Sequence, residues 1–554
     1  MTPSLEIGNG NWAVKSDSLL GYKTIDGKYY PREIGVTRAT TATRVNAEGL
    51  VELVPYNLFQ YSEQLQNAAW VQERATINVN ATTAPDGTLT ADKVVENTDT
   101  NSHRIRQNIA SNASVVYTFS GYIKSAGRTK VRVFGGGVNA SCDFDLTNGT
   151  IIGTPTLCTA TITDAGNGWW RCSITYTQNT TSAAQLHLYA PLDAAGNFSY
   201  TGDGVSGIYV WGAQLVEGTE PKDYLPTTDR LDIARIDYST GEAALLVEPQ
   251  RTNLARWSEQ FDNAFWTKQG STTITANTTI APNGILTADT LSGADGTGVT
   301  GNVLRRNTID LVDPATWSIW VKSLGATTVS LYMRNGSTGV VTSSTHSIDS
   351  NWKRITLTGV IRLGQITIGG TDGDVAIWGA QLEVGSYATS YIPTPGDFDV
   401  TRNADVVSMT NASAYIGQTE GTLYAEFELE SGSTEFKVIS ISDGTTNNRV
   451  VIAANGQTDL RGFVVYGSTV GTLITSSVLS GFIKIAIAYD ASTYTLFING
   501  SQIGTQSRGA FGATLTNFSF DQGNGSNNFY GNVKSAALYK ERLSNTELAT
   551  LTTL

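Results

Sequence analysis

Apolar and polar residues alternate with a period of two along most of the chain, and long stretches with the 3.6-residue period of a helix are absent. In Val115–Ser125 one strand face carries Tyr117, Phe119, Gly121 and Ile123, and the other carries Thr118, Ser120, Tyr122 and Lys124. Asn-Gly and Asp-Gly pairs, which suit turns that need positive φ, separate such runs. The pattern predicts an all-β chain built from antiparallel sandwiches.

A long sequence repeat organises the first two thirds of the chain. The pentapeptide WGAQL occurs at Trp211–Leu215 and again at Trp378–Leu382. Motifs shared by both copies, in the same order, are NLFQYSEQLQNAAW and NLARWSEQFDNAFW, APDGTLTADKV and APNGILTADTL, GYIKSAG and IWVKSLG, NGWWRC and SNWKRI, and DYLPT and SYIPT. The second copy is shorter in the middle, as expected for loop deletions between two homologous domains.

The tryptophans of the repeat are predicted to lie in the cores of these domains. In IYVWGAQL, strict alternation places Tyr209, Trp211, Ala213 and Leu215 on the core face. The same argument places Trp378 in the core of the second copy. In TWSIWVKS, Trp317, Ile319 and Val321 form one face, and Trp320 and Lys322 form the other. Trp70 and Trp266, which follow the shared Asn-Ala pair, are expected to fill core positions.

The C-terminal part reads as a third sandwich. Its six strand candidates are GTLYAEFELE, FKVISISDG, NRVVIAANG, GFIKIAIAYD, YTLFINGSQIG and FYGNVKSAALY. Asn499-Gly500 is the expected hairpin turn. Near the end of the chain, Ser544 precedes an NTEL run that predicts one short capped helix.

Five segments follow from these patterns. They are an N-terminal attachment or oligomerisation segment at 1–56, sandwich 1 at 57–227, a joint at 228–252, sandwich 2 at 253–394, and a third sandwich at 397–554. Three related stretches, each with an arginine near its start, introduce the domains: Thr37–Leu58, Ala234–Leu254 and, more faintly, Thr401–Met409. We expect them to act as rigid joints.

The composition of the chain limits the classes of molecule that it is expected to bind. Apolar residues make up 40% of the chain and charged residues 16%, with a net charge of −12 and no block of like charge. Such a chain can bury cores, but it lacks the basic patches that attract nucleic acid or anionic membranes. No apolar run approaches the ~20 residues of a membrane helix, and the N-terminus does not resemble a signal peptide. The three cysteines, Cys142, Cys158 and Cys172, are expected to be buried thiols.

The ordered motifs NLxxYSExxxNAxW, APDGxxTADK, GWWR and IYVWGAQLxEG, followed by YLPT, resemble the sandwich modules of bacteriophage tail-fibre and other virion surface proteins. Those modules are similar to jelly-roll carbohydrate-binding modules. The C-terminal part, with FING and NGSNNFYGNVKSAALYKERLSNTEL, resembles concanavalin A-like (laminin G-like) lectin domains. The resemblance implies a non-enzymatic display role on the virion surface, in a homotrimeric fibre made in the cytoplasm of the bacterial host.

Carbohydrate-binding sandwiches present aromatic faces flanked by polar groups. Tyr122 with Lys124, and Trp320 with Lys322, meet this description, because each pair lies on the strand face opposite the predicted core. The alternative is that this face packs against other protein. In the third sandwich, Asp443, Asn447, Asp521 and Asn524 lie in polar loops that could supply oxygen ligands to Ca²⁺. Their spacing matches no defined calcium loop, so ordinary turn chemistry is the alternative there.

One strand raises an enzymatic alternative. Glu426, Glu428 and Glu430 alternate along AEFELE, and a retaining glycosidase needs two carboxyl groups about 5–5.5 Å apart. The pattern of concanavalin A-like glucanases, with an aspartate between two glutamates, is missing, so a solvated strand face is the favoured interpretation.

The sequence therefore predicts a non-enzymatic phage virion surface protein, a tail fibre or fibre-like appendage. It would attach to other virion proteins through its N-terminal segment and bind host-surface glycans. The alternatives are a capsid-attached head fibre or decoration protein and, less favoured, a glycan depolymerase. Neither nucleic acid nor membrane insertion is expected.

Overall fold

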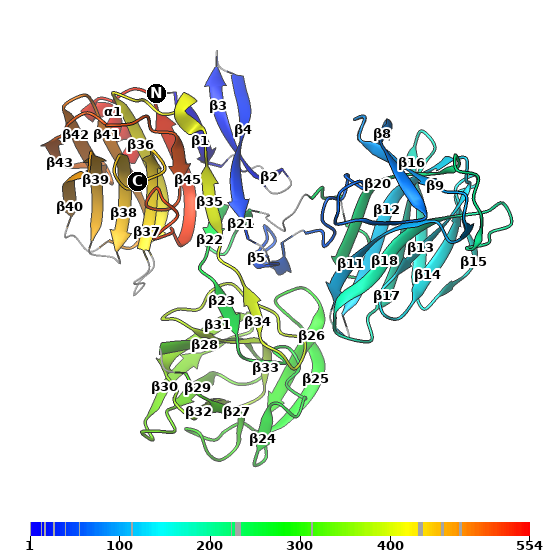
Figure 1. Cartoon of the computed structure of the whole chain (residues 1–554). Helices are drawn as coiled ribbons and strands as arrows, with labels where there is room; N and C mark the ends of the chain where they lie inside the picture. Colours follow the sequence, from blue (N-terminus) through cyan, green and yellow to red (C-terminus); the bar gives the residue numbers. More distant parts are fainter. Residues whose placement is uncertain are drawn as a thin grey trace. The chain divides into compact units, whose positions relative to one another are not determined.

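The computed structural model describes residues 2–10, 12, 14–15, 18–25, 28–38, 40–54, 56–111, 113, 115–222, 224–227, 234–311, 314–429, 436–455, 459–475 and 479–554. The chain forms two compact units. One, the inserted unit, comprises Pro55–Leu231, and the other, the discontinuous unit, joins Met1–Val54 to Asp232–Leu554. Almost all regular structure is β, which confirms the predicted fold class (Figure 1).

The inserted unit is sandwich 1, with two six-stranded antiparallel sheets. The first has the order β15(Thr150–Thr156), β14(Ala140–Asp145), β13(Lys130–Gly135), β18(Ser182–Leu192), β11(Arg104–Ser111), β7(Val71–Glu73). The second has the order β16(Thr159–Gly166), β17(Trp169–Thr177), β12(Val116–Ala126), β20(Gly207–Glu217), β9(Ala91–Glu96), β8(Ala75–Thr82). A short pair, β10(Thr100–Asn101) and β19(Tyr200–Thr201), lies outside both sheets.

Sandwich 2 repeats this plan with five strands in each sheet. The first sheet has the order β24(Thr267–Gln269), β27(Val303–Ile309), β32(Gly364–Gly369), β29(Thr328–Arg334), β30(Val341–Ser347). The second has the order β25(Thr273–Ile280), β26(Leu286–Ser292), β33(Val375–Val384), β28(Pro314–Ser323), β31(Lys353–Val360). Each sandwich therefore places its WGAQL strand, β20 or β33, at the centre of its second sheet.

The cores of the two sandwiches confirm most of the predicted faces. Tyr117, Phe119 and Ile123 are buried between the sheets of sandwich 1, as are Trp317, Ile319 and Val321 in sandwich 2. Trp70 and Trp266 lie in the same two cores. Of the cysteines, none of which forms a disulfide, Cys142 and Cys172 are buried and Cys158 is partly buried.

Sandwich 3 is built mainly from the C-terminal strands. These are β36(Gly421–Leu429), β37(Phe436–Ser442), β38(Arg449–Asn455), β39(Leu460–Tyr466), β40(Thr469–Thr475), β41(Gly481–Tyr489), β42(Thr493–Ile498), β43(Ser501–Ser507), β44(Asn517–Ser519) and β45(Gly531–Tyr539). The helix α1(Asn545–Thr552) has Ser544 as its N-cap and a capping box with Glu547, as the sequence predicts. A single 3₁₀ turn, η1(Ala412–Ala414), precedes β36.

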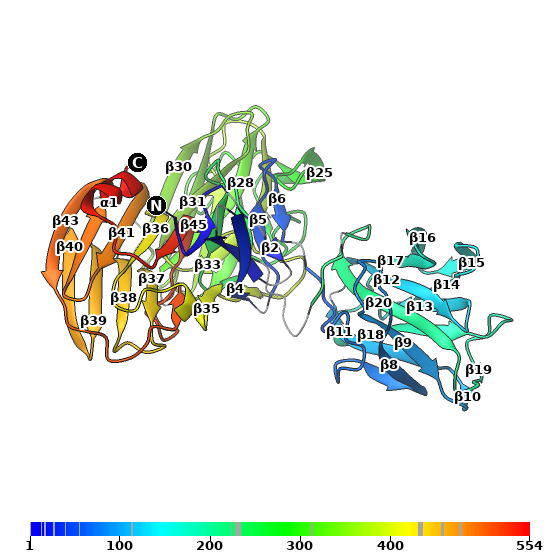
Figure 2. The ribbon, with the colours of Figure 1, turned by 90° about the horizontal axis from the view of Figure 1, so that it is seen from above.

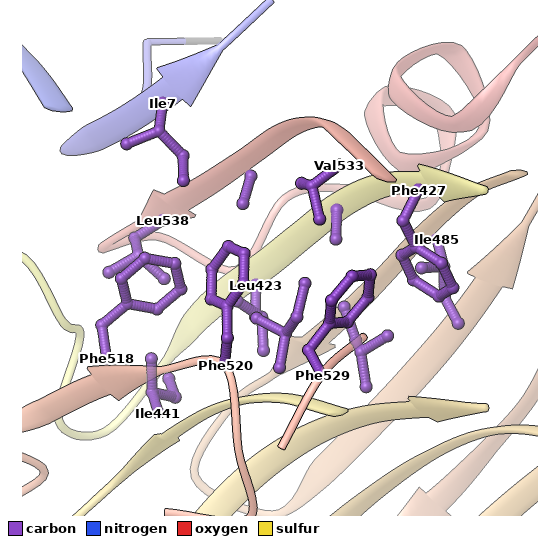
Figure 3. Packing of buried hydrophobic residues seen from close by; sticks show 14 of the residues in the cluster. Ile7, Leu423, Phe427, Ile441, Ile485, Phe518, Phe520, Phe529, Val533 and Leu538 are labelled. Atoms are coloured by element: carbon purple, nitrogen blue, oxygen red, sulfur yellow. The ribbon is translucent and has the colours of Figure 1, made fainter. Parts of the chain in front are cut away.

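Segments from elsewhere in the chain complete sandwich 3. The added strands are β1(Leu5–Gly8), β2(Val14–Lys15), β3(Ser18–Ile25), β4(Lys28–Thr37), β21(Arg235–Asp237), β22(Ala244–Val247) and β35(Val406–Met409). β1 and β22 both pair with β45, while β35 pairs with β4 and β44. Figure 3 shows Ile7 of β1 directed toward the core beside Leu538. Residues 1–56 and 228–252, treated above as a separate segment and a joint, thus supply strands to this sheet.

Two short pairs lie beside sandwich 2. The hairpin β5(Thr43–Val45) and β6(Val51–Leu53), here called the cover hairpin, comes directly before sandwich 1 in the chain. The other pair joins β23(Arg251–Asn253) to β34(Val400–Arg402). In Figure 2 the cover hairpin appears next to β28.

The three arginine-led stretches meet in one buried ionic cluster of the discontinuous unit. Arg38 binds Asp405 at 2.6 Å, Arg402 binds Glu248 at 2.7 Å, and Arg235 binds both carboxylates. Burial alone would raise the pKa of Glu248, but the charges of Arg402 and Arg235 lower this pKa to about 2. The cluster ties together three stretches that lie far apart in sequence, and their role as rigid joints stays a prediction.

Candidate functional site: a repeated aromatic cluster

Each of the first two sandwiches carries an aromatic cluster on the outer face of its second sheet. Outer cluster 1, in sandwich 1, comprises Tyr122, Trp169, Arg171, Trp211 and Tyr224. Its Trp211 ring lies 5.3 Å from the Tyr122 ring and 4.6 Å from the Tyr224 ring, centroid to centroid. Outer cluster 2, in sandwich 2, comprises Trp320, Trp352, Arg354, Trp378 and Tyr391. There the Trp378 ring lies 5.4 Å from Trp320 and 4.7 Å from Tyr391.

A glycine with positive φ makes each cluster possible. Gly212 has φ 63° and Gly379 has φ 65°, and the pairing of β12 with β20 and of β28 with β33 shifts register at these residues. Such a bulge inserts an extra residue, which turns the preceding side chain to the other face of the sheet. Trp211 and Trp378 are therefore buried, but they lie in the outer clusters and not between the sheets.

This bulge corrects the strict alternation assumed for IYVWGAQL. Ala213 and Leu215 do lie between the sheets, as predicted. On the other side of Gly212 the residues between the sheets are Ile208 and Val210, so the predicted places of Tyr209 and Trp211 between the sheets are wrong. The predicted burial of Trp211 is confirmed, but in outer cluster 1. The sequence contained the signal, because a glycine inside a strand often marks a bulge.

An arginine covers one ring in each cluster. The guanidinium of Arg171 lies over Tyr122 at 5.4 Å from the ring centroid, and that of Arg354 lies over Trp320 at 4.3 Å. Arg171 donates to the carbonyl oxygen of Lys222 at 2.5 Å. Arg354 donates to the carbonyl oxygen of Thr389 at 2.6 Å. The sequence reasoning missed both arginines, although each follows a repeat tryptophan at the same place in the two copies.

The repeat also preserves the hydrogen bonds at the edge of each cluster. The Tyr224 hydroxyl donates to Glu63, and the Tyr391 hydroxyl donates to Glu259, both at 3.0 Å. Burial raises the pKa of the Glu63 and Glu259 carboxyl groups. Trp352 donates from Nε1 to a backbone carbonyl at 3.0 Å, as its counterpart Trp169 does. The two clusters are thus the same local structure built twice.

The two clusters differ in what lies on top of them. On sandwich 2 the cover hairpin packs against outer cluster 2 through Val45 and Val51. The Val51 N–H donates to the carbonyl oxygen of Pro282 at 3.0 Å, and the Thr43 hydroxyl donates to that of Tyr391 at 2.5 Å. Among the described residues of the inserted unit, no hairpin packs on outer cluster 1 in this way. Tyr224 is half-buried, whereas its counterpart Tyr391 is 2% exposed. The other pair shows the reverse, because Trp169 is 1% exposed and its counterpart Trp352 is half-buried.

A cavity of about 440 Å³ lies beneath the cover hairpin. Its lining includes Trp320 and Arg354 of outer cluster 2, Val45 and Val51 of the cover hairpin, and Asn532 of β45. This volume falls within the range of about 300–1,000 Å³ that is usual for small-molecule sites. The predicted binding residue Trp320 therefore lines a cavity, and Tyr122 lies on a face that receives no hairpin from the described residues of the inserted unit.

The predicted lysines lie beside these aromatic groups. Lys124 is half-buried on β12, where its cross-strand neighbours are Trp169 and Tyr209. Lys322 is half-buried on β28, opposite Ala376. Each lysine is thus placed on the same strand face as its predicted aromatic partner, and a role for either lysine in binding stays a prediction.

The four predicted calcium ligands are engaged in loop contacts. Asp443 accepts from Thr445 and Asn448, and Asn447 accepts from the Ser468 hydroxyl. Asp521 accepts from Ser519 and the Gly523 N–H, and Asn524 accepts from Ser526. No group of three or more His, Cys, Asp or Glu side chains suited to a metal occurs among the described residues. Calcium binding stays a prediction.

The glutamates behind the enzymatic alternative have structural partners. Glu426 lies 4.0 Å from the Lys484 ammonium, and Glu428 accepts from the Asn532 amide at 2.8 Å. Glu430 lies outside the described residues. Within the part of the chain that the structure describes, no helix is long and apolar enough to cross a membrane.

Comparison with known proteins gives structural neighbours only, since no protein-family model and no curated protein matches the chain. The chain is similar to the CBM40 module of the Ruminococcus gnavus IT-sialidase bound to α2,3-sialyllactose (18% identity, TM-score 0.22). That match covers 25% of this chain and 84% of the module.

Two other solved structures are similar at comparable levels. A tandem CBM22 domain of Paenibacillus barcinonensis Xyn10C has 12% identity and a TM-score of 0.21, covering 60% of this chain and 98% of that one. The NanB sialidase of Streptococcus pneumoniae has 13% identity and a TM-score of 0.22, covering 26% of each chain. These values assign no ligand to this chain.

Proposed function

We propose that this protein is a non-enzymatic virion surface protein of a bacteriophage, and that outer cluster 1 of sandwich 1 binds host-surface glycan. The observation that carries the proposal is the contrast between two copies of one aromatic cluster. In sandwich 2 the chain's own hairpin occupies the cluster, whereas the inserted unit supplies no such hairpin to its copy among its described residues. Tyr122, Arg171 and Tyr224 of outer cluster 1 are half-buried, and the aromatic surface they leave accessible is a reason to expect a ligand.

The chemistry of outer cluster 1 suits a sugar. The Tyr122 and Tyr224 rings offer apolar surface with polar edges, and the Arg171 guanidinium adds hydrogen-bond donors beside them. Aromatic surface with a few convergent polar groups is the usual composition of such a site. The acidic chain, at −12, further favours neutral ligands over polyanions.

The virion part of the proposal rests on the resemblance of the repeat motifs. It includes a homotrimeric fibre that attaches to other virion proteins. Cryo-electron microscopy of the phage particle, with this chain located and its copies counted, tests that part. Density at the tail supports a tail fibre, density on the capsid supports a head fibre or decoration protein, and absence from the particle refutes both.

Glycan arrays with the full chain test the binding part. Tyr122→Ala and Arg171→Ala are expected to weaken the strongest signal at least tenfold, about 1.4 kcal/mol. Phe198→Ala is the matched control, because Arg132 lies over Phe198 in the same way, at 5.0 Å, away from outer cluster 1. Equal losses in all three variants, or no glycan bound by the wild-type chain, would contradict the proposal.

A further inference from the structure

Sandwich 2 lacks two strands that sandwich 1 has. In sandwich 1, β15 pairs with β14 at the margin of the first sheet, and β16 pairs with β17 at the margin of the second. Residues 146–168 separate β14 from β17, whereas only 348–352 separate their counterparts β30 and β31 in sandwich 2. The shortening of the second repeat therefore leaves β30 and β31 as edge strands, and Figure 1 shows β30 at the margin of its sheet.

The edge strand β30 lacks the features that usually protect an open edge. Its seven residues, VTSSTHS, are mostly exposed and include no proline and no Asp, Glu, Lys or Arg. All of them pair with β29 without a shift in register. Burial and the nearby charge of Lys353 lower the pKa of His346, so its ring is neutral at pH 7. A regular, uncharged edge of this length is competent to pair with another strand.

Every other edge strand described in sandwiches 1 and 2 has a protective feature. β15 contains Pro155. A charged residue occurs in each of β7, β16, β24 and β31. The pairing of β8 with β9 and of β25 with β26 shifts register. Natural proteins use charges, prolines and bulges to keep edge strands from pairing, so β30 is the exception within the described part of these two sandwiches.

The open side of β30 also has apolar surface at one end. Among the described residues β30 pairs with β29 alone. At its C-terminal end the Lys353 ammonium donates to the carbonyl oxygen of Ser347 at 3.3 Å. At its N-terminal end Val340 is 60% exposed and Val341 is 42% exposed. An open backbone edge next to exposed valines is the combination expected of a surface that docks another strand.

We propose that β30 is a docking edge for a second copy of this chain, whose own β30 pairs with it antiparallel about a twofold axis. An antiparallel pair of identical strands is self-complementary, because each contact is made twice. The charge of the chain favours this edge over others, since two copies that each carry −12 can approach along an uncharged strand without like charges in contact. Each copy gains the strand that β15 supplies in sandwich 1. The contact does not depend on the proposed binding of glycan.

Sedimentation equilibrium of the full chain over a hundredfold range of concentration tests the proposal. Ser343→Lys and Ser343→Glu change an exposed residue of β30, and each places like charges near one another across the twofold contact. We expect the wild-type assembly at high concentration to have twice the mass of either variant. Thr275→Lys, at an exposed residue of the edge strand β25 in the same sandwich, is the matched control and should behave as the wild type. Equal masses of the wild type and both Ser343 variants at every concentration would overturn the proposal.

A mixture of the two variants tests whether β30 meets β30. When Ser343→Lys and Ser343→Glu are mixed, opposite charges face each other, so the doubled mass should return. Failure to return, with both variants shown to be folded by thermal unfolding, would assign the contact to a different edge and refute the proposal. If a variant is unfolded, the same two substitutions at the exposed Thr345 replace it.

The step in mass also separates this proposal from the homotrimer proposed above. Doubling from three chains to six agrees with both, because a twofold contact between trimers gives a closed assembly. Doubling from one chain to two would refute the homotrimer and support the β30 contact. A trimer whose mass is the same in the wild type and in Ser343→Lys would support the homotrimer and refute the β30 contact.

Discussion

Sandwich 1 and sandwich 2 contain the same aromatic cluster in different surroundings. Both have the bulged glycine, the stacked arginine and the tyrosine bound to a half-buried glutamate. The cover hairpin packs against the second cluster, and Trp320 lines a cavity there. The first cluster receives no hairpin from the described residues of its own unit. The comparison teaches that a repeated motif specifies a local structure, whereas the segments packed against it differ from one copy to the other.

Breaking the buried ionic cluster of the discontinuous unit should give the largest loss of stability. Arg235→Ala would leave Glu248 and Asp405 partly unpaired, and breaking a buried ion pair from one side costs about 3–5 kcal/mol. We expect calorimetry to show a lower unfolding temperature for the discontinuous unit and no change for the inserted unit. Arg132→Ala, which removes a partly exposed pair with Asp143, is the control and should cost at most about 1 kcal/mol. Equal shifts in the unfolding temperatures of both units would contradict the assignment of the ionic cluster to the discontinuous unit.

Acidification should destabilise the same unit. The pKa of Glu248 is lowered to about 2 from its ordinary value of 4.5, so the unfolded state binds more protons between these values. The contribution, roughly 3 kcal/mol at 1.36 kcal/mol per pKa unit, is complete above pH 4.5 and is lost as the pH falls toward 2. Denaturant unfolding of the wild type and of Glu248→Gln from pH 2 to 7 measures it. The difference between the two proteins should shrink in acid.

Sandwich 1 should respond to pH in the opposite direction. Burial raises the pKa of Glu217 to about 7, although a hydrogen bond with Tyr56 opposes the shift. The stability that depends on the neutral carboxyl group is therefore complete below pH 4.5 and is lost as the pH rises through about 7. Glu217→Gln is expected to flatten this dependence in the inserted unit only. A flat wild-type profile between pH 5 and 8 would be the contrary result.

The bulged glycines should differ in sensitivity because of the cover hairpin. A Cβ at Gly379 would lie 2.9 Å from the Trp320 ring, and one at Gly212 would lie 3.0 Å from the Tyr122 ring. Positive φ costs a non-glycine residue about 1–3 kcal/mol at either position. We expect Gly379→Ala to cost more, because the cover hairpin packs against the cluster that contains Trp320, whereas the inserted unit provides no such hairpin beside Tyr122 among its described residues.

Two controls isolate the contribution of backbone strain in this glycine comparison. Gly241 and Gly166 also have positive φ, but a Cβ added at either residue would have no neighbouring atom within 4 Å. Gly241→Ala in the discontinuous unit and Gly166→Ala in the inserted unit should therefore show the free-energy cost of backbone strain alone. If Gly212→Ala proves as costly as Gly379→Ala after this correction, the two clusters are equally confined and the comparison fails.

The smallest expected effect concerns the cover hairpin itself. Val51→Ala removes part of an 8% exposed side chain and should cost about 1 kcal/mol. It should also make Trp320 more accessible to acrylamide. The difference in acrylamide quenching of tryptophan fluorescence between Val51→Ala and Val51→Ala/Trp320→Phe measures this accessibility. Unchanged quenching would show that the hairpin does not shield outer cluster 2.

Much of the fold was predictable, because period-two patterning is a local property. The all-β class, the faces of β12 and β28, the Asn499-Gly500 turn and the Ser544 helix cap follow from short stretches of sequence. The candidate site was predictable in part. Tyr122 and Trp320 could be placed opposite the core, but strict alternation failed at Gly212, since a bulge changes the face of every residue beyond it.

The sequence by itself determined the repeat, the strands and the composition of the two aromatic clusters, because each depends on neighbours within one strand or one turn. Only the tertiary structure decided that β1 and β22 pair with β45, that Arg38, Arg235 and Arg402 share two carboxylates, and that the cover hairpin lies on sandwich 2. These contacts join segments separated by hundreds of residues. No local pattern encodes them, because their free energy arises from surfaces that meet only after each element has formed.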